Sequence, residues 1–191
     1  MGSSRYSGEH TYELIRLSAS ALIHQRGFEA MSMRQLAERA GIQAGSLYRY
    51  FPSKHCLLFE LLCDYFDDLL CAWYEVRPRG AAAEQALAAF VENHLVWHAQ
   101  RGQQGGLIDP GEARSLAVAE QLRVQQLAQS YAQELRQIIA CGVRQGCFHC
   151  DDVPFVSDAI LALLSTAGRG RTDAVIEQCA SYRAMVFKLV R

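Results

Sequence analysis

The run AGSLYRYFPSK, residues 44–54, gathers side chains suited to contact with nucleic acid. Its first three residues are small enough to approach base edges in a DNA major groove. Tyr48 and Tyr50 can donate hydroxyl groups to phosphates, and Arg49 carries a guanidinium that suits a phosphate or a guanine. The pattern favours a short helix that enters a DNA groove.

Two short helices joined by a tight turn would position these side chains. Ser32 and Gln35 have the spacing of a capping box, which predicts a helix that begins at Ser32. Gly41 ends it with a residue that can adopt positive φ. The second helix covers residues 44–50 and stops before Pro52. Together the two helices predict a helix-turn-helix unit.

The other elements are predicted to be helices too, because apolar residues recur at three- and four-residue spacing and only four of 191 residues are proline. Gly102 to Gly111 is expected to be a loop, with a long helix following from Glu112. The longest apolar runs fall far below the roughly 20 residues that span a bilayer, and no secretory leader is evident. We therefore expect a cytoplasmic protein. The predicted helices are residues 10–25, 32–40, 44–50, 53–76, 81–101, 112–144, 153–167 and 172–190.

The charge is unevenly distributed along the chain. Residues 1–55 carry seven Lys or Arg against four Glu, whereas the remainder carries twelve basic against sixteen acidic residues. The basic N-terminal part fits contact with phosphates.

The run RQLAERAGIQAGSLYRYFPSKHCLL resembles the DNA-binding domain of TetR/AcrR-type transcriptional regulators, over about residues 11–60. The turn glycine, the aromatic pair and Lys54 lie at the offsets of that family. The resemblance implies an all-α fold, with a helix-turn-helix domain at residues 1–54 and a larger effector-binding and dimerisation domain at residues 55–191. The DNA contacts it implies are Arg34, Ala44, Gly45, Ser46, Tyr48, Arg49, Tyr50 and Lys54.

The resemblance further implies a homodimeric repressor, released from a palindromic operator in double-stranded DNA by a small hydrophobic effector. Ligand packing would tilt the fourth helix and change the separation of the recognition helices. The segment EARSL at Glu112 and the long helix after it resemble family members that sense acyl-CoA thioesters. Arg114 and Arg123 would then contact the phosphates of the acyl-CoA. No cofactor and no metal are expected.

An effector-responsive dimer needs an effector pocket and a dimer interface. For the residues predicted at each, the alternative is ordinary packing in the core of one chain. The effector pocket is predicted to be lined by Phe66, Trp73, Phe90, His94, Trp97, His98 and Tyr131. The dimer interface is predicted on the last two helices, at Val156, Ile160, Leu163, Leu164, Val175, Cys179, Val186 and Leu189.

The seven cysteines leave a second mechanism open. Without a secretory leader they are read as reduced thiols. Cys56 follows Lys54 and His55 in the first turn of a helix, a setting that lowers a thiol pKa, so a redox-sensing repressor of the same fold is an alternative. Cys141, Cys147, His149 and Cys150 crowd together but match no closed zinc pattern.

An enzyme and a helical adaptor are the alternatives from other classes of protein. A Cys/His enzyme would draw on the cysteines and six histidines, but the sequence contains no phosphate-binding glycine loop, H-E-x-x-H motif or nucleophile elbow. An enzyme is therefore not expected. A helical adaptor that binds other proteins is the remaining alternative, and the basic, aromatic helix at residues 44–50 argues against it.

Overall fold

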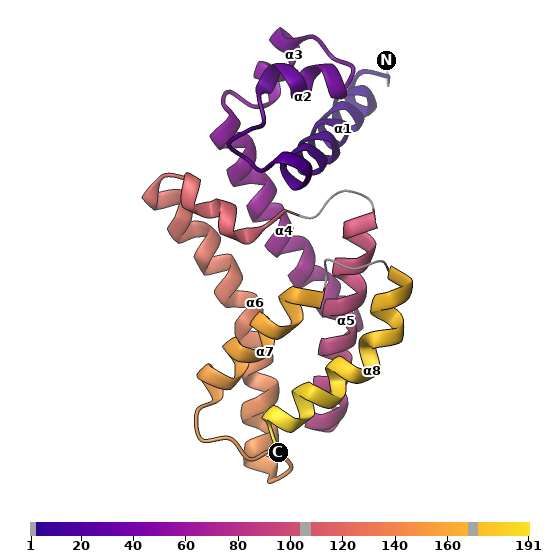
Figure 1. The fold of residues 1–191 in the computed structure, drawn as a ribbon, viewed down its shortest axis with the longest axis vertical. Helices are drawn as coiled ribbons and strands as arrows, with labels where there is room; N and C mark the ends of the chain where they lie inside the picture. The colour runs from indigo at the N-terminus through magenta and orange to yellow at the C-terminus, as the bar shows by residue number, and fades with distance from the viewer. Residues whose placement is uncertain (1–2, 104–107, 168–171) are drawn as a thin grey trace. The chain divides into compact units, whose positions relative to one another are not determined.

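The computed structural model describes the backbone of residues 3–103, 108–167 and 172–191, and the side chains of residues 8–102, 108–166 and 178–191. Within these ranges the chain forms helices and no strand, which confirms the all-α prediction (Figure 1). No helix in the described ranges is long and apolar enough to cross a membrane. The elements are α1 (Ser3–Arg26), α2 (Met33–Arg39), α3 (Ala44–Tyr50), α4 (Lys54–Val76), α5 (Ala83–Gln103), the 3₁₀ helix η1 (Pro110–Ser115), α6 (Val118–Gln145), α7 (Val153–Ala167) and α8 (Thr172–Leu189).

Contacts divide the chain into two compact units. Unit 1 comprises the described parts of residues 1–65 and 104–124, and unit 2 those of residues 66–103 and 125–191. Helices α4 and α6 therefore each contribute residues to both units. The predicted boundary after residue 54 separates a DNA-binding domain from an effector-binding and dimerisation domain. It is defined by function and stays a prediction.

Unit 1 is built around the contacts of α2 with α1 and with α3. Its core contains Ile15 from α1, Leu36 from α2 and Leu47 from α3, all completely buried. Tyr12 stacks on the buried ring of Phe51, with ring centroids 5.3 Å apart. These contacts fix α3 on its apolar side and leave its other side exposed.

Local hydrogen bonds set both ends of α2 as predicted. The Gln35 amide donates to Ser32 Oγ at 3.2 Å, and the Ser32 amide donates to Gln35 Oε1 at 3.1 Å. Gly41 has φ of 66°, and the Ile42 amide then donates to the Ala37 carbonyl at 3.0 Å. The capping box and the turn glycine are thus confirmed.

The segment before α6 differs from the prediction, which began a long helix at Glu112. Instead Pro110–Ser115 forms a 3₁₀ helix, and α6 begins at Val118. The Asp109 carboxylate accepts from the Gly111 amide at 2.8 Å and so caps the short helix. The Ala117 amide donates to Glu120 Oε2 at 3.1 Å, which starts the new helix. The buried side chain of Leu116 lies between the two.

Unit 2 contains the contacts among α5, α7 and α8, and α8 runs beside α5 (Figure 1). Ile160 and Leu164 on α7 and Val186 on α8 are completely buried within the chain. These three residues therefore belong to the core of one chain and lack the exposed surface that the predicted dimer interface requires. The side chain of Val175 lies outside the described residues.

Candidate DNA interface and effector site

The recognition helix α3 presents most of its predicted contacts to solvent. Leu47 holds the helix to the core and is completely buried, whereas Tyr48 keeps 50% of its surface exposed. Ser46 and Tyr50 are half-buried. Of the other residues predicted to contact DNA, Arg34 on α2 and Ala44, Gly45 and Arg49 on α3 are exposed.

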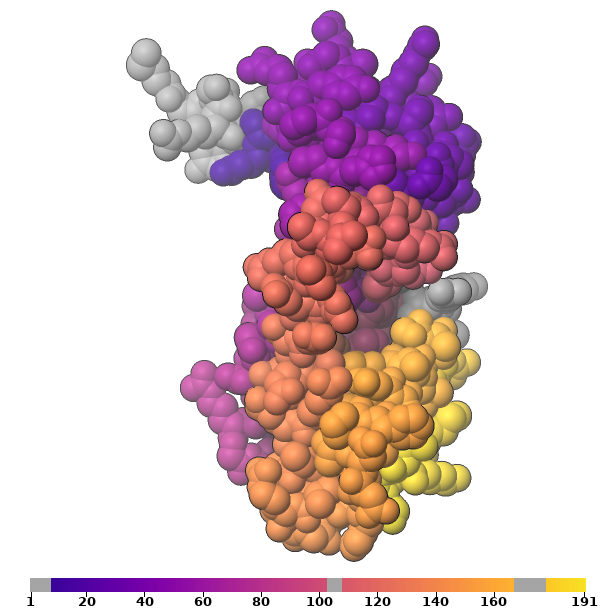
Figure 2. Space-filling model, turned by 90° about the vertical axis from the view of Figure 1, so that its left-hand side faces the viewer, coloured from indigo at the N-terminus to yellow at the C-terminus, as the bar shows by residue number. Residues whose placement is uncertain are grey.

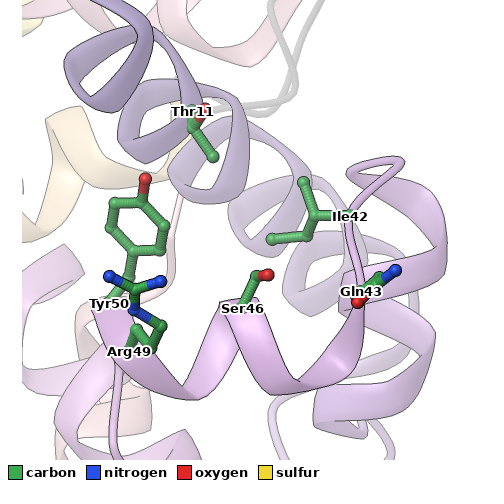
Figure 3. A pocket seen from close by; sticks show the side chains of 6 residues that line it. All are labelled: Thr11, Ile42, Gln43, Ser46, Arg49 and Tyr50. Carbon is green, nitrogen blue, oxygen red and sulfur yellow. The ribbon is translucent and has the colours of Figure 1, made fainter. Parts of the chain in front are cut away.

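A surface pocket of about 480 Å³ lies along one side of α3. Figure 3 shows Ser46 in the middle of this side, Gln43 at one end, Arg49 and Tyr50 at the other, and Thr11 facing them from α1. The sixth lining residue is Ile42. Thr11 and Gln43 were not predicted, because Thr11 is distant in sequence and Gln43 precedes the helix that carried the prediction.

Lys54 has a different environment from the predicted phosphate contact. Its Nζ donates to the backbone carbonyls of Phe28 and Glu29, both at 3.1 Å, and lies 4.4 Å from the centroid of the Phe28 ring. The Glu29 carboxylate is 3.8 Å away. The ammonium is thus occupied within unit 1, where it fastens the turn that follows α1.

Glu112 of η1 holds the same turn. Its Oε1 accepts a hydrogen bond from the Phe28 amide at 3.1 Å. The backbone of Phe28 is therefore held through its carbonyl by Lys54 and through its amide by Glu112. No local sequence pattern could have revealed Glu112, because 84 residues separate it from Phe28.

We expect Lys54→Met to lower the free energy of unfolding by about 1–2 kcal/mol, because it removes a charged donor from two carbonyls. Lys188→Met, which changes an exposed lysine on α8, is the matched control and should leave stability nearly unchanged. Urea titration of both variants measures the difference.

The same variant separates a structural role of Lys54 within the chain from contact with a DNA phosphate. A lysine engaged within the chain should leave the salt dependence of DNA binding as steep as in the wild type. A lost phosphate contact would reduce the slope of log K against log [salt] by about 0.9 for each protomer. A slope reduced by that amount would show that Lys54 contacts a DNA phosphate, as the sequence predicts.

Six of the seven predicted pocket residues meet in one cluster of rings in unit 2. Phe90 packs against Trp73 and Tyr131 at centroid distances of 5.1 and 5.0 Å. His94 stacks on His98 at 4.1 Å, and Trp97 meets His98 edge to face at 4.9 Å. The seventh residue, Phe66, is half-buried on α4. Arg114 and Arg123, the predicted phosphate partners of an acyl-CoA, are exposed residues of unit 1.

The two histidines in this cluster are held in the neutral form. Burial, and secondarily the charge of His98, place the pKa of His94 well below its ordinary value. Burial lowers the pKa of His98 to about 4. The Nδ1 of His98 lies 2.7 Å from the His94 carbonyl oxygen, which can only accept, so this nitrogen carries the proton.

His94 has one ring nitrogen with a partner and one without. Its Nδ1 lies 3.0 Å from the hydroxyl of Tyr131. Its Nε2 is buried and has no hydrogen-bond partner among the described residues. A buried polar atom of this kind costs about 1–3 kcal/mol, which an incoming polar group could offset.

The thiol at Cys56 is not activated as predicted. Burial raises its pKa, and the Glu60 carboxylate one turn along α4 raises it further by its charge and by accepting from Sγ at 3.7 Å. Burial also raises the pKa of Cys150 and Cys179. Within the described part of the chain, no three His, Cys, Asp or Glu side chains are grouped so as to hold a metal ion.

Two family models match the chain. Residues 15–61 match the model of bacterial regulatory proteins of the tetR family, and residues 80–169 match that of the tetracyclin repressor-like C-terminal domain. The HTH-type transcriptional repressor KstR2 of Rhodococcus jostii strain RHA1 is 29% identical over 150 residues, which are 78% of this chain and 72% of the relative.

Solved structures share the fold. A bacterial regulatory protein of the tetR family from Rhodococcus RHA1 superposes with a TM-score of 0.85 at 23% identity, over 94% of this chain and 96% of the other. AibR, solved in complex with isovaleryl coenzyme A and operator DNA, superposes with a TM-score of 0.77 at 20% identity, over 93% and 98% of the two chains. At these identities the likeness concerns the fold alone.

Proposed function

The chain belongs to the tetR family of bacterial regulatory proteins, and we propose that it is a ligand-responsive repressor that binds a palindromic operator as a homodimer. The observation that carries the proposal is α3, a helix anchored by Leu47 with Tyr48 and Arg49 exposed on its other side. One such helix contacts few base pairs, so two copies on one palindrome are needed for selectivity. We propose DNA contact by Arg34, Ala44, Gly45, Ser46, Tyr48, Arg49 and Tyr50.

The proposed dimer interface lies on the outer faces of α7 and α8, which lie side by side in Figure 2 (orange and yellow). Phe155, Met185 and Leu189 are large apolar side chains with exposed fractions of 71%, 48% and 44%. Burial of such residues against a second copy would stabilise a dimer. Val156, Leu163 and Cys179, which are partly exposed, remain in the proposed interface.

The proposed effector is a small hydrophobic molecule, with acyl-CoA as the class to test. The ring cluster around Phe90 offers apolar surface, and the unpartnered Nε2 of His94 offers one polar anchor among the described residues. The complex of AibR with isovaleryl coenzyme A supports the same class. The effector would act by favouring a conformation with lower affinity for the operator.

We further propose that the protein acts in the cytoplasm and has no catalytic activity. Its family consists of DNA-binding regulators, and DNA is its proposed site of action. No step of the proposed mechanism requires a chemical transformation of the effector.

The test is an electrophoretic shift on the DNA upstream of the protein's own gene. The wild type should shift this DNA, and added acyl-CoA of suitable chain length should release it, whereas free CoA should not. If no acyl-CoA in a series from short to long chains releases the DNA, the effector class is wrong and the DNA-binding assignment still stands.

Two tyrosine variants serve as matched tests of the DNA-binding surface. Tyr48→Ala should weaken binding about 10-fold, because it removes a hydroxyl and a ring from α3. Tyr74→Ala, which changes a tyrosine of similar exposure (44%) on α4, should bind like the wild type. Equal binding by both variants would remove α3 from the proposed DNA interface.

A further inference from the structure

Gln43 immediately precedes α3, yet its side chain does not cap the helix. Residues at this position are usually Ser, Thr, Asp or Asn, whose short side chains fold back onto the first amides. Here only the backbone carbonyl of Gln43 takes part, accepting from Ser46 at 2.9 Å and Leu47 at 3.1 Å. The carboxamide makes no cap hydrogen bond and stands at the exposed start of the recognition helix.

The residues beside Gln43 are suited to hold a phosphate. Gln43 is one of the residues that line the surface pocket along α3 (Figure 3). The same pocket is lined by three residues with hydroxyl groups, Thr11, Ser46 and Tyr50, and by Arg49 with its guanidinium. These groups can all donate to the oxygens of a phosphodiester, and such contacts set the register of a protein on DNA. A backbone phosphate in this pocket would bring the end of α3 to the adjoining base edges.

We propose that Gln43 determines operator specificity by reading one adenine in each half-site. Its carboxamide has the geometry for this base, since the oxygen can accept from adenine N6 while the nitrogen donates to N7. Ala44 and Gly45, which follow it, add little bulk that would keep the helix end away from the groove floor. The inference rests on the proposed function, because it requires α3 to enter the major groove.

Selection of bound sequences from a random duplex library tests this assignment with the full-length protein. The wild type should enrich a palindrome in which one position of each half-site prefers adenine by about 10-fold. Gln43→Ala should lose the preference at that position alone. Gln43→Glu should change the preference there to cytosine, because a carboxylate accepts from cytosine N4 but cannot donate to adenine N7.

Gln25→Ala, which changes an exposed glutamine on α1 outside the pocket, is the control and should select the wild-type palindrome. The same palindrome for the wild type and Gln43→Ala would overturn the inference while leaving the proposed DNA binding intact. A lost preference for a base other than adenine would overturn the assignment of adenine. A wild-type protein that enriches no sequence would overturn the proposed function and the inference with it.

Discussion

Acidification from pH 7 to pH 5 is expected to lower the free energy of unfolding by about 2 kcal/mol through the buried His98, and the buried His94 adds a loss of the same sign. Both have a folded-state pKa below the ordinary value of 6.5. The unfolded chain therefore binds more protons than the folded chain once the pH falls below about 6.5. Stability is fully present above that pH and is lost progressively as the pH approaches the folded pKa, about 4 for His98.

The cause of the acid sensitivity can be isolated by comparing variants across the same pH range. His98→Phe should lose about 2 kcal/mol less than the wild type between pH 7 and pH 5, whatever its stability at pH 7. His24→Gln, which changes an exposed histidine on α1, should follow the wild-type curve. Urea titrations at several pH values provide the data. A wild type whose stability does not change between pH 7 and pH 5 would contradict the buried, neutral state of the histidines.

The parts of the fold that could be predicted from sequence are those set by neighbouring residues. Ser32 and Gln35 identify the start of α2 because the capping box needs only residues three positions apart. His94 and His98 lie one turn apart on α5, so their shared side could be read from their spacing. Their partner Tyr131 on α6 was predicted as a member of the same pocket, and the structure places it in hydrogen-bonding distance of His94.

The parts that could not be predicted depend on which distant surfaces meet. Lys54 has the position of a phosphate contact, and only the fold reveals that its ammonium reaches the carbonyls of Phe28 and Glu29. Ile160 and Val186 have the helical spacing of apolar residues in either a core or an interface. Contact of α7 and α8 with α5 decides between the two, because it buries both side chains within one chain.

The end of α6 contains a close contact that the sequence does not indicate. Gly146 has φ of 74° and its amide donates to the Val143 carbonyl, while the Cys147 amide donates to the Gly142 carbonyl at 3.0 Å. This is the Schellman arrangement, and it turns the chain back over the helix. The ring of Phe148, which is almost completely buried, then lies directly against Gly142.

Gly142→Ala is therefore expected to destabilise the protein by about 2 kcal/mol, although alanine is the better helix former. A Cβ at this position would overlap the Phe148 ring, whose Cγ would be only 2.7 Å away, and the packed core gives the ring little room to move. For a chain of this size the melting temperature should fall by about 4–8 °C.

Gly8→Ala is the matched control: that glycine is also helical, but an added Cβ meets nothing within 4 Å, so the melting temperature of this variant should stay the same or rise. Phe148→Leu in the Gly142→Ala background should cost less than it does in the wild type, because the smaller side chain relieves the overlap. Additive effects of the two substitutions would show that Phe148 is not the obstacle.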